Sequence, residues 1–245
     1  MFRFAAAVLL VLVSTLAHAE QVVPLTIGGT EVRIAMQDGY LRASEKAPSL
    51  FATSAAALPP PIRLVESLLA ESDLKRVLVG QGMALPYLQV QAMRDAEALD
   101  FSVEDWRALQ PMLAKQLGAI DLDAQTQATQ SGMGERMGKA SGGTVEIKFG
   151  EIGKPVVYSQ AGDVIRYAMR LPMKGAVNGQ PVEMVLDCAG AALVLNGKLL
   201  MINTYLREDG RDDAFADVRA FLETQVQRAQ ALNPQAAPPE GRKAG

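Results

Sequence analysis

Histidine and cysteine are almost absent from this chain of 245 residues, which contains one of each, His18 and Cys188. His18 lies in an N-terminal segment with the pattern of a cleaved signal peptide, so we expect the mature chain to contain no histidine. That absence excludes Ser-His-Asp and Cys-His centres, histidine acid-base catalysis and histidine-ligated zinc or copper. A single cysteine allows no intramolecular disulfide, so stability must come from a packed core.

The first nineteen residues have the three parts of a secretory signal peptide. Arg3 precedes an apolar run from Phe4 to Leu16, and Ala17-His18-Ala19 is a small-x-small cleavage pattern. We therefore expect cleavage after Ala19 and, in a bacterial cell, a periplasmic or secreted protein. The apolar run is shorter than the roughly 20 residues of a membrane-spanning helix, and no later segment comes closer. We expect no integral membrane segment in the mature chain.

Charge is nearly balanced, with 24 basic and 27 acidic side chains in the whole chain. Removal of Arg3 with the signal peptide leaves 23 basic and 27 acidic side chains, a formal charge of −4. This balance argues against binding to nucleic acid or anionic membranes. The length fits one domain over residues 20–232. Asn233 to Gly245 is rich in Pro, Ala, Gly and charge, so we expect a disordered tail there.

The chain before residue 143 reads as a mixture of strands and helices. Gly28-Gly29 is a hairpin turn between two β-rich runs, because glycine tolerates the positive φ that such a turn needs. Further along we expect strands over Ile62 to Leu69 and Pro86 to Ala96, and a short helix or irregular excursion between them over Ser72 to Leu78. The expected helices run from Pro48 to about Ala57, from Ser102 to Leu117 with a kink or break at Pro111, and from Asp121 to about Gln130 at the periphery.

The chain after residue 143 is typical of a β-meander followed by a helix. Ser131 to Gly143 is glycine-rich and is expected to be a mobile loop. The expected strands are Val145 to Phe149, Val156 to Ser159, Val164 to Leu171, Val182 to Cys188 or beyond, and Lys198 to Arg207, each pairing with its neighbour in sequence. The last helix should bury Phe215, Val218 and Leu222 against the sheet. The fold class predicted is α+β, a central antiparallel meander flanked by helices, or α/β/α sandwich.

Two short patterns imitate ligand-binding motifs and fail on spacing. Gly132 to Ala140 resembles a phosphate-binding loop, but five residues separate Gly132 from Gly138, and Ala140 stands where a hydroxyl is needed. Asp121 and Asp123 suggest a calcium loop, but the glycine and the final glutamate are missing at their offsets. A flexible loop and the start of a helix explain these two stretches better.

The remaining candidate residues each have a simpler structural explanation. Cys188 is most simply a small buried residue, although a nucleophilic or redox role remains an alternative. Asp163 or Glu183 with another acid would suit a glycosidase, but sequence cannot supply their separation. The tyrosines and the tryptophan could line a ligand groove, but sheet packing is the simpler explanation (Tyr40, Tyr87, Trp106, Tyr158, Tyr167, Tyr205). Four methionines could bind copper through their thioether groups, but core filling is the simpler explanation (Met133, Met137, Met169, Met173).

From Val145 to Leu232, the order of strands, hairpin and final amphipathic helix resembles the PsbP/Mog1-like α/β/α sandwich, with Gly197 to Tyr205 followed by Phe215 to Leu222 carrying the likeness. The first half, through Gly39-Tyr40 and Glu71-Ser72-Asp73, is similar to a group of uncharacterised exported proteobacterial proteins. The resemblance implies a sheet between helical layers and an accessory or binding role without catalysis. It implies no functional residue, because it contains no diagnostic motif.

We therefore expect an exported, soluble accessory or binding protein of the cell envelope, with an envelope protein or a small ligand as its partner. We expect no cofactor, and the sequence nominates no catalytic, cofactor-binding or metal-ligating residue. The alternatives are a cell-envelope hydrolase that uses a carboxylate pair, and a Cys- or Met-based redox or metal-handling protein. The Val182 to Leu232 stretch reads as scaffold. An exposed rim formed by the glycine-rich stretch and Asn178-Gly179 is the better place for a site.

Overall fold

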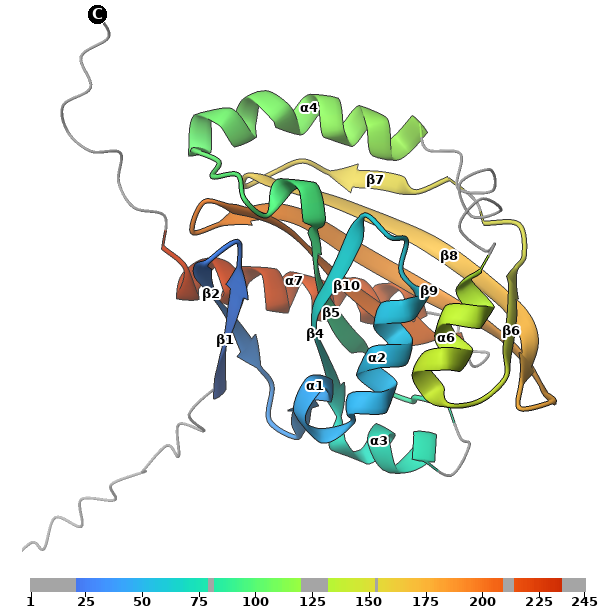
Figure 1. Ribbon diagram of the computed structural model, residues 1–245. Helices are drawn as coiled ribbons and strands as arrows, with labels where there is room; N and C mark the ends of the chain where they lie inside the picture. Colours follow the sequence, from blue (N-terminus) through green and yellow to red (C-terminus); the bar gives the residue numbers. More distant parts are fainter. Residues whose placement is uncertain (1–20, 79–81, 120–131, 153, 209–213, 235–245) are drawn as a thin grey trace, which may run out of the picture.

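An antiparallel β-sheet joins the two halves of the chain and is covered by helices (Figure 1). The computed structural model describes residues 21–78, 82–119, 132–152, 154–208 and 214–234. The strands are β1 (Gln21–Ile27), β2 (Thr30–Met36), β3 (Tyr40–Arg42), β4 (Ile62–Ala70), β5 (Tyr87–Met93), β6 (Val145–Phe149), β7 (Val156–Ser159), β8 (Val164–Val177), β9 (Gln180–Leu195) and β10 (Lys198–Arg207). The helices are α1 (Ala43–Lys46), α2 (Pro48–Ala57), α3 (Glu71–Leu78), the 3-10 turn η1 (Arg94–Ala96), α4 (Val103–Ala119), α6 (Met133–Ser141) and α7 (Ala214–Leu232).

The main sheet has eight strands, in the order β3-β4-β5-β10-β9-β8-β6, with β7 also paired to β8. The two halves meet where β5 pairs antiparallel with β10, for example Val90 opposite Ile202. Because α7 packs on one face of this sheet and α4 on the other, the expected fold class, α+β with an antiparallel sheet flanked by helices, is confirmed.

Two-residue turns with left-handed backbone close the hairpins. Gly28 and Gly29 join β1 to β2, Asn178-Gly179 joins β8 to β9, and Asn196-Gly197 joins β9 to β10, all with positive φ. Asparagine and glycine tolerate that conformation with little strain, which is why these pairs mark tight hairpins. The strands on either side are longer than the sequence suggested, because β8 continues to Val177 and β9 runs from Gln180 to Leu195.

The expectation that every meander strand pairs with its neighbour in sequence holds for β7-β8, β8-β9 and β9-β10, but it is wrong for the neighbours β6 and β7. Both pair with β8, at different places along it: β6 lies opposite residues 173–177, and β7 lies opposite residues 166–168. The extra length of β8 explains the difference, because one fourteen-residue strand offers room for two short partners end to end.

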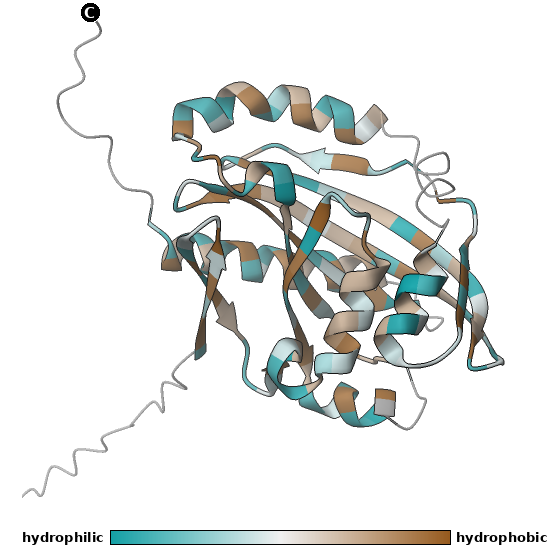
Figure 2. Ribbon diagram, in the orientation of Figure 1, coloured by the Kyte–Doolittle hydropathy of each residue, from teal (hydrophilic) through white to brown (hydrophobic). Residues whose placement is uncertain are grey.

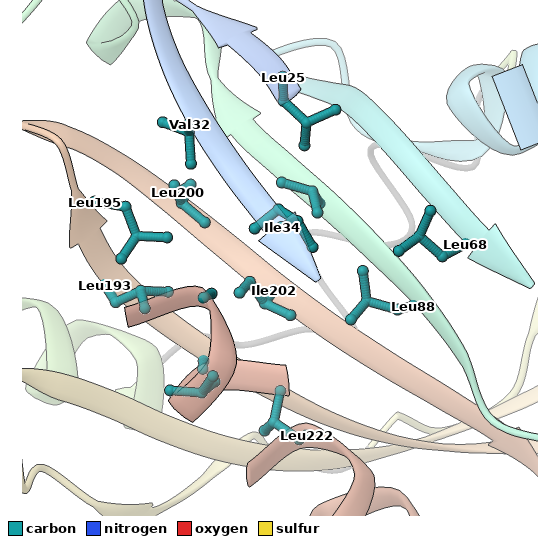
Figure 3. Packing of buried hydrophobic residues seen from close by; sticks show 14 of the residues in the cluster. Leu25, Val32, Ile34, Leu68, Leu88, Leu193, Leu195, Leu200, Ile202 and Leu222 are labelled. Atoms are coloured by element: carbon teal, nitrogen blue, oxygen red, sulfur yellow. The ribbon is translucent and has the colours of Figure 1, made fainter. Parts of the chain in front are cut away.

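The α7 face of the sheet carries the main apolar core. Side chains alternate between the two faces of a strand, and one set from β5, β8, β9 and β10 packs against α7 and the β1-β2 hairpin (Figure 3). Leu200, Ile202 and Leu222 are among its fully buried members. Figure 2 shows many hydrophobic residues in β4 and β5 and many hydrophilic residues in α6. The predicted burial of Val218 and Leu222 is confirmed.

The opposite face, here called the α4 face, has a smaller apolar cluster at one end. Trp106 and Ala114 of α4 pack there on Ile165, Ala192 and Val194. Ser102 and Asp105 form a capping pair at the start of α4, with mutual hydrogen bonds of 2.7–3.1 Å. Pro111 does not divide α4, which is assigned as one helix over Val103–Ala119. The helix expected over residues 121–130 lies outside the described residues.

The glycine-rich stretch is a helix, so the expected mobile loop is wrong. Gly132 and Gly142, both left-handed, bracket α6. Within it, a Cβ on Gly134 would lie 2.5 Å from the Val145 carbonyl oxygen, and one on Gly138 would lie 2.7 Å from the Gly143 carbonyl oxygen. Two of these glycines therefore serve close packing, and the number of glycines in the stretch did not indicate flexibility.

Asn233 fastens the N-terminal hairpin to the end of α7. Its side-chain amide donates to the Arg33 carbonyl oxygen at 2.7 Å and accepts from the Arg33 N–H at 2.9 Å, as a neighbouring strand would. Asn196 donates to its Oδ1 at 3.0 Å. Asn233 is 1% exposed, so the expected disordered tail does not begin there. In the described segments no helix is long and apolar enough to cross a membrane.

Candidate functional site

A surface groove of about 650 Å³ opens where the β2-β3 turn, the start of α3, the approach to β5 and one side of α7 meet. We call it the Tyr40 groove. Aromatic and aliphatic residues form its floor (Tyr40, Leu85, Pro86, Phe221), and polar or charged residues form its rim (Gln37, Asp38, Glu71, Ser72, Lys75). Tyr40 and Phe221 come from opposite ends of the chain, so only the folded sheet and α7 bring them together.

Tyr40 is held rigidly in the floor. Its ring stacks on Phe221 with centroids 5.6 Å apart and an interplanar angle of 23°. Its hydroxyl donates a hydrogen bond of 2.7 Å to the Pro86 carbonyl oxygen. Burial, with the charge of Asp73, raises the pKa of Tyr40 to about 12. The hydroxyl therefore stays protonated and acts as a positioning donor rather than an acid-base group.

The walls of the groove depend on α3. The buried carboxylate of Asp73 accepts hydrogen bonds from the Ala84 and Leu85 N–H groups at 3.0 and 2.8 Å, which fixes the approach to β5. At the rim, Lys75 Nζ lies 3.1 Å from Glu71 Oε1, and both side chains are exposed. The groove thus combines a stacked aromatic floor with solvated charges of both signs. Such a surface can bind a ligand or a partner segment, because aromatic anchors and polar rims are typical of binding sites.

A second polar arrangement lies inside the molecule, on the α4 face of the sheet. The Tyr167 hydroxyl donates to Asn203 Oδ1 at 2.7 Å, and Gln91 Nε2 donates to Gln89 Oε1 at 2.8 Å. Beside them, Tyr87 and Tyr205 stack with centroids 5.0 Å apart. We call these six residues the polar layer. Gln89, Gln91, Tyr167 and Asn203 are buried, so their hydrogen bonds stabilise the fold only while both partners are present.

Cys188 is buried next to the polar layer and is 1% exposed. Burial raises the pKa of its thiol to about 12, with a hydrogen bond from Tyr205 acting in the opposite direction. A thiol that stays protonated and has no access to solvent cannot act as a nucleophile or bind metal near neutral pH. This environment matches the simplest sequence interpretation, in which Cys188 fills space.

Asp163 and Glu183, each considered with another acid for catalysis, do not form a pair with each other. Asp163 precedes β8 and forms a two-pronged ion pair with Arg107 at 2.9 Å, and these hydrogen bonds lower the pKa of its carboxyl group. Glu183 pairs with Lys174 near the other end of the β8-β9 hairpin. Ten strand positions separate the two ends, or about 33 Å, whereas a glycosidase pair needs roughly 5–10 Å. Across the ranges that the structure covers, no three His, Cys, Asp or Glu side chains gather as a metal site.

The rim expected at Asn178-Gly179 does form. The Thr144 N–H donates to Asn178 Oδ1 at 3.0 Å, and the Asn178 N–H donates to the Thr144 carbonyl oxygen at 2.8 Å, so the end of the glycine-rich stretch and the turn are joined. The methionines considered for copper lie on two elements, Met133 and Met137 on α6, and Met169 and Met173 on β8. Asp121 and Asp123 lie outside the described residues.

The aromatic residues of the sheet fall into several settings. Tyr87, Tyr167 and Tyr205 belong to the polar layer, while Trp106 is a buried residue of α4 whose indole N–H donates to the Asp163 carbonyl oxygen at 2.6 Å. Tyr40, one of the aromatic residues considered for a ligand groove, does line a surface groove, but sequence reasoning did not identify Phe221 or the other residues that line it. Nothing in the sequence pairs Tyr40 with Phe221, because neither residue lies in a motif.

Comparison with known proteins gives one weak structural similarity. No family model and no curated protein sequence matches the chain. Among solved structures, the chain is similar to the solution structure of cyanobacterial PsbP (CyanoP) from Synechocystis sp. PCC 6803, with 12% sequence identity and a TM-score of 0.31 over 80% of this chain and 84% of that one. A TM-score of 0.31 marks a weak PsbP-like similarity and transfers no function to this chain.

Proposed function

We propose that this chain is an exported accessory or binding protein of the cell envelope, without catalytic activity, and that it binds a partner protein or small ligand in the Tyr40 groove. The observation that carries this proposal is the groove of about 650 Å³ with its stacked Tyr40 and Phe221 floor. The ring positions are fixed before binding by the hydrogen bond from Tyr40 to Pro86. A preorganised aromatic floor favours binding, because little side-chain entropy remains to be lost.

Site-directed photo-crosslinking tests the binding role. A photo-crosslinking residue placed at Ser72, on the rim, is exposed to a soluble cell-envelope extract, with Ser49 on α2 as the matched exposed position away from the groove. We expect adducts from Ser72 and none from Ser49. Tyr40→Ala should abolish the Ser72 adduct, while Tyr40→Phe, which keeps the ring, should retain most of it. Equal labelling from the two positions would contradict the proposal.

A hydrolase assay tests the non-catalytic part. Asp38 and Glu71 are the carboxylates of the groove, so a carboxylate-dependent reaction in it would depend on them. We expect purified mature protein to release no soluble fragments from peptidoglycan. Release by the wild type that disappears in Asp38→Asn or Glu71→Gln would contradict the proposal and support the envelope-hydrolase alternative.

Export and relationship to the exported proteobacterial group are also part of this proposal. Arg3, the apolar run that follows it and Ala17-His18-Ala19 support cleavage after Ala19. In a bacterial host, the mature protein should appear outside the cytoplasm with Glu20 as its first residue, as N-terminal sequencing would show. An uncleaved chain that stays in the cytoplasm would contradict the proposed location.

A further inference from the structure

Arg219 differs from the arginines around it in having no carboxylate partner among the described residues. On the same side of the molecule, Arg166 Nε lies 2.7 Å from Glu223 Oε1, and Arg170 Nε lies 2.9 Å from Asp187 Oδ1. Arg219 is exposed, and its guanidinium lies over the Tyr158 ring, 4.5 Å from the centroid, and over the Phe215 ring at 5.6 Å. Two aromatic rings therefore hold this cation in position, as carboxylates hold Arg166 and Arg170.

We propose that Arg219 is the anchor for a carboxylate on an acidic segment of a partner protein. Stacking uses the flat face of a guanidinium and leaves its N–H edge available for a two-pronged hydrogen bond to a carboxylate. Because the rings already restrict the side chain, an incoming anion would find Arg219 preorganised. Arginine supported by aromatic residues is also the composition enriched in binding hot spots.

An unused hydroxyl lies beside the guanidinium. The Tyr158 hydroxyl oxygen is shielded from solvent and has no hydrogen-bond partner in the described chain. Buried hydroxyl groups are normally paired, so an unpaired one under an exposed cation marks a surface that a partner completes. A partner that draws the guanidinium outward would give this hydroxyl access to an acceptor.

The local charges favour a carboxylate over a phosphate group. Arg166 and Arg170 are each paired with a carboxylate. A second carboxylate is near Arg170, with Glu208 Oε2 3.8 Å from Arg170 Nε. Within the described segments, the surroundings therefore offer Arg219 as a single unpaired cation rather than the cluster of cations that suits a doubly charged phosphate. The occupant we infer is an Asp- or Glu-bearing peptide segment.

Arginine side-chain NMR of the mature protein tests this inference, with acetylated hexaglutamate as the probe and acetylated hexaglutamine as the uncharged control. We expect hexaglutamate alone to shift the Arg219 Nε–Hε signal, and Arg219→Gln to weaken binding at least tenfold. Arg219→Lys keeps the charge but loses the fork and most of the stacking, so it should bind about threefold more weakly than the wild type. Arg33→Gln, the matched loss of an exposed arginine elsewhere, should change binding less than twofold.

Four results would overturn the inference. They are the absence of a shift at Arg219, an equal loss of binding in Arg33→Gln, full binding by Arg219→Lys, and a shift caused by inorganic phosphate as large as that caused by hexaglutamate. Tyr40→Ala should leave hexaglutamate binding unchanged, so the outcome is independent of the proposal for the Tyr40 groove.

Discussion

The two faces of the central sheet are built from the same strands but are held together by different interactions. On the α7 face, aliphatic side chains of β5, β9 and β10 pack against α7 and the β1-β2 hairpin. On the α4 face, residues of β5, β8 and β10 form the polar layer, where Tyr167, Asn203 and two glutamines are buried with their hydrogen bonds. The α7 face is stabilised by apolar packing and the α4 face by hydrogen bonds between buried polar groups. Different substitutions should therefore destabilise each face.

The α7 face should show the largest loss on truncation. Leu222→Ala removes a fully buried side chain and leaves a cavity, so we expect the free energy of unfolding to fall by about 3 kcal/mol. Urea denaturation measures this change. Leu99→Ala is the matched control, because Leu99 is 53% exposed and its truncation should cost about 0.5 kcal/mol or less. Equal effects for the two leucines would show that α7 is not docked on the sheet.

The α4 face should instead be sensitive to added volume. A Cβ on Gly190 would lie 2.3 Å from Tyr167 Cζ and 2.4 Å from Asn203 Oδ1, so Gly190→Ala should cost about 2 kcal/mol by overpacking. Gly118→Ala on α4 is the control, since a Cβ there meets nothing within 4 Å. That change should stabilise by about 0.5 kcal/mol. A neutral Gly190→Ala would mean that the Tyr167 ring can move aside.

Loss of one hydroxyl should separate pairing from packing. Tyr167→Phe leaves the buried Asn203 Oδ1 without its donor, so stability should fall by about 1.5 kcal/mol in urea denaturation. Tyr158→Phe removes a hydroxyl that has no partner, so it should be close to neutral in the isolated protein. Similar costs for both changes would show that the hydrogen bond in the polar layer contributes nothing beyond ring packing.

Alkaline pH should destabilise the α4 face, and its effect should be the smallest of the four predicted changes in stability. The pKa of Cys188 rises from an ordinary value of 9.0 to about 12 because of burial. The folded state therefore holds the thiol proton more tightly than the unfolded state. The stability that this provides is complete below pH 9 and is lost as pH rises toward 12. Urea denaturation at pH 8, 9 and 10 should show a shallower decline in Cys188→Ala, and parallel curves would contradict this assignment.

Local patterns predicted the elements, whereas long-range contacts decided the rest. The Asn196-Gly197 turn, the capping pair at Ser102 and the buried stripe of α7 were all readable, because each depends on residues a few positions apart. The glycine-rich stretch misled, since Gly134 and Gly138 allow the carbonyl oxygens of Val145 and Gly143 to approach α6 closely. A glycine in a sequence does not show whether it provides backbone flexibility or allows two segments to pack closely.

The candidate site was beyond sequence reasoning for a related reason. Tyr40 and Phe221 meet only because β5 pairs with β10 and α7 folds back over the sheet. That Arg219 has no carboxylate partner among the described residues is equally a property of the folded molecule, because many acids surround it in sequence. In contrast, the presence of only one histidine and one cysteine in the sequence could be read directly, and it narrowed the possible chemistry.

The hydrogen bonds between Asn233 and Arg33 also determine which part of the fold can be completed first. Arg33, on the N-terminal hairpin, exchanges hydrogen bonds with a residue 200 positions later, and the hairpin packs on α7. That packing cannot be completed until the ribosome has made the last turn of α7. The part of the molecule that is synthesised first is thus among the last to reach its final place.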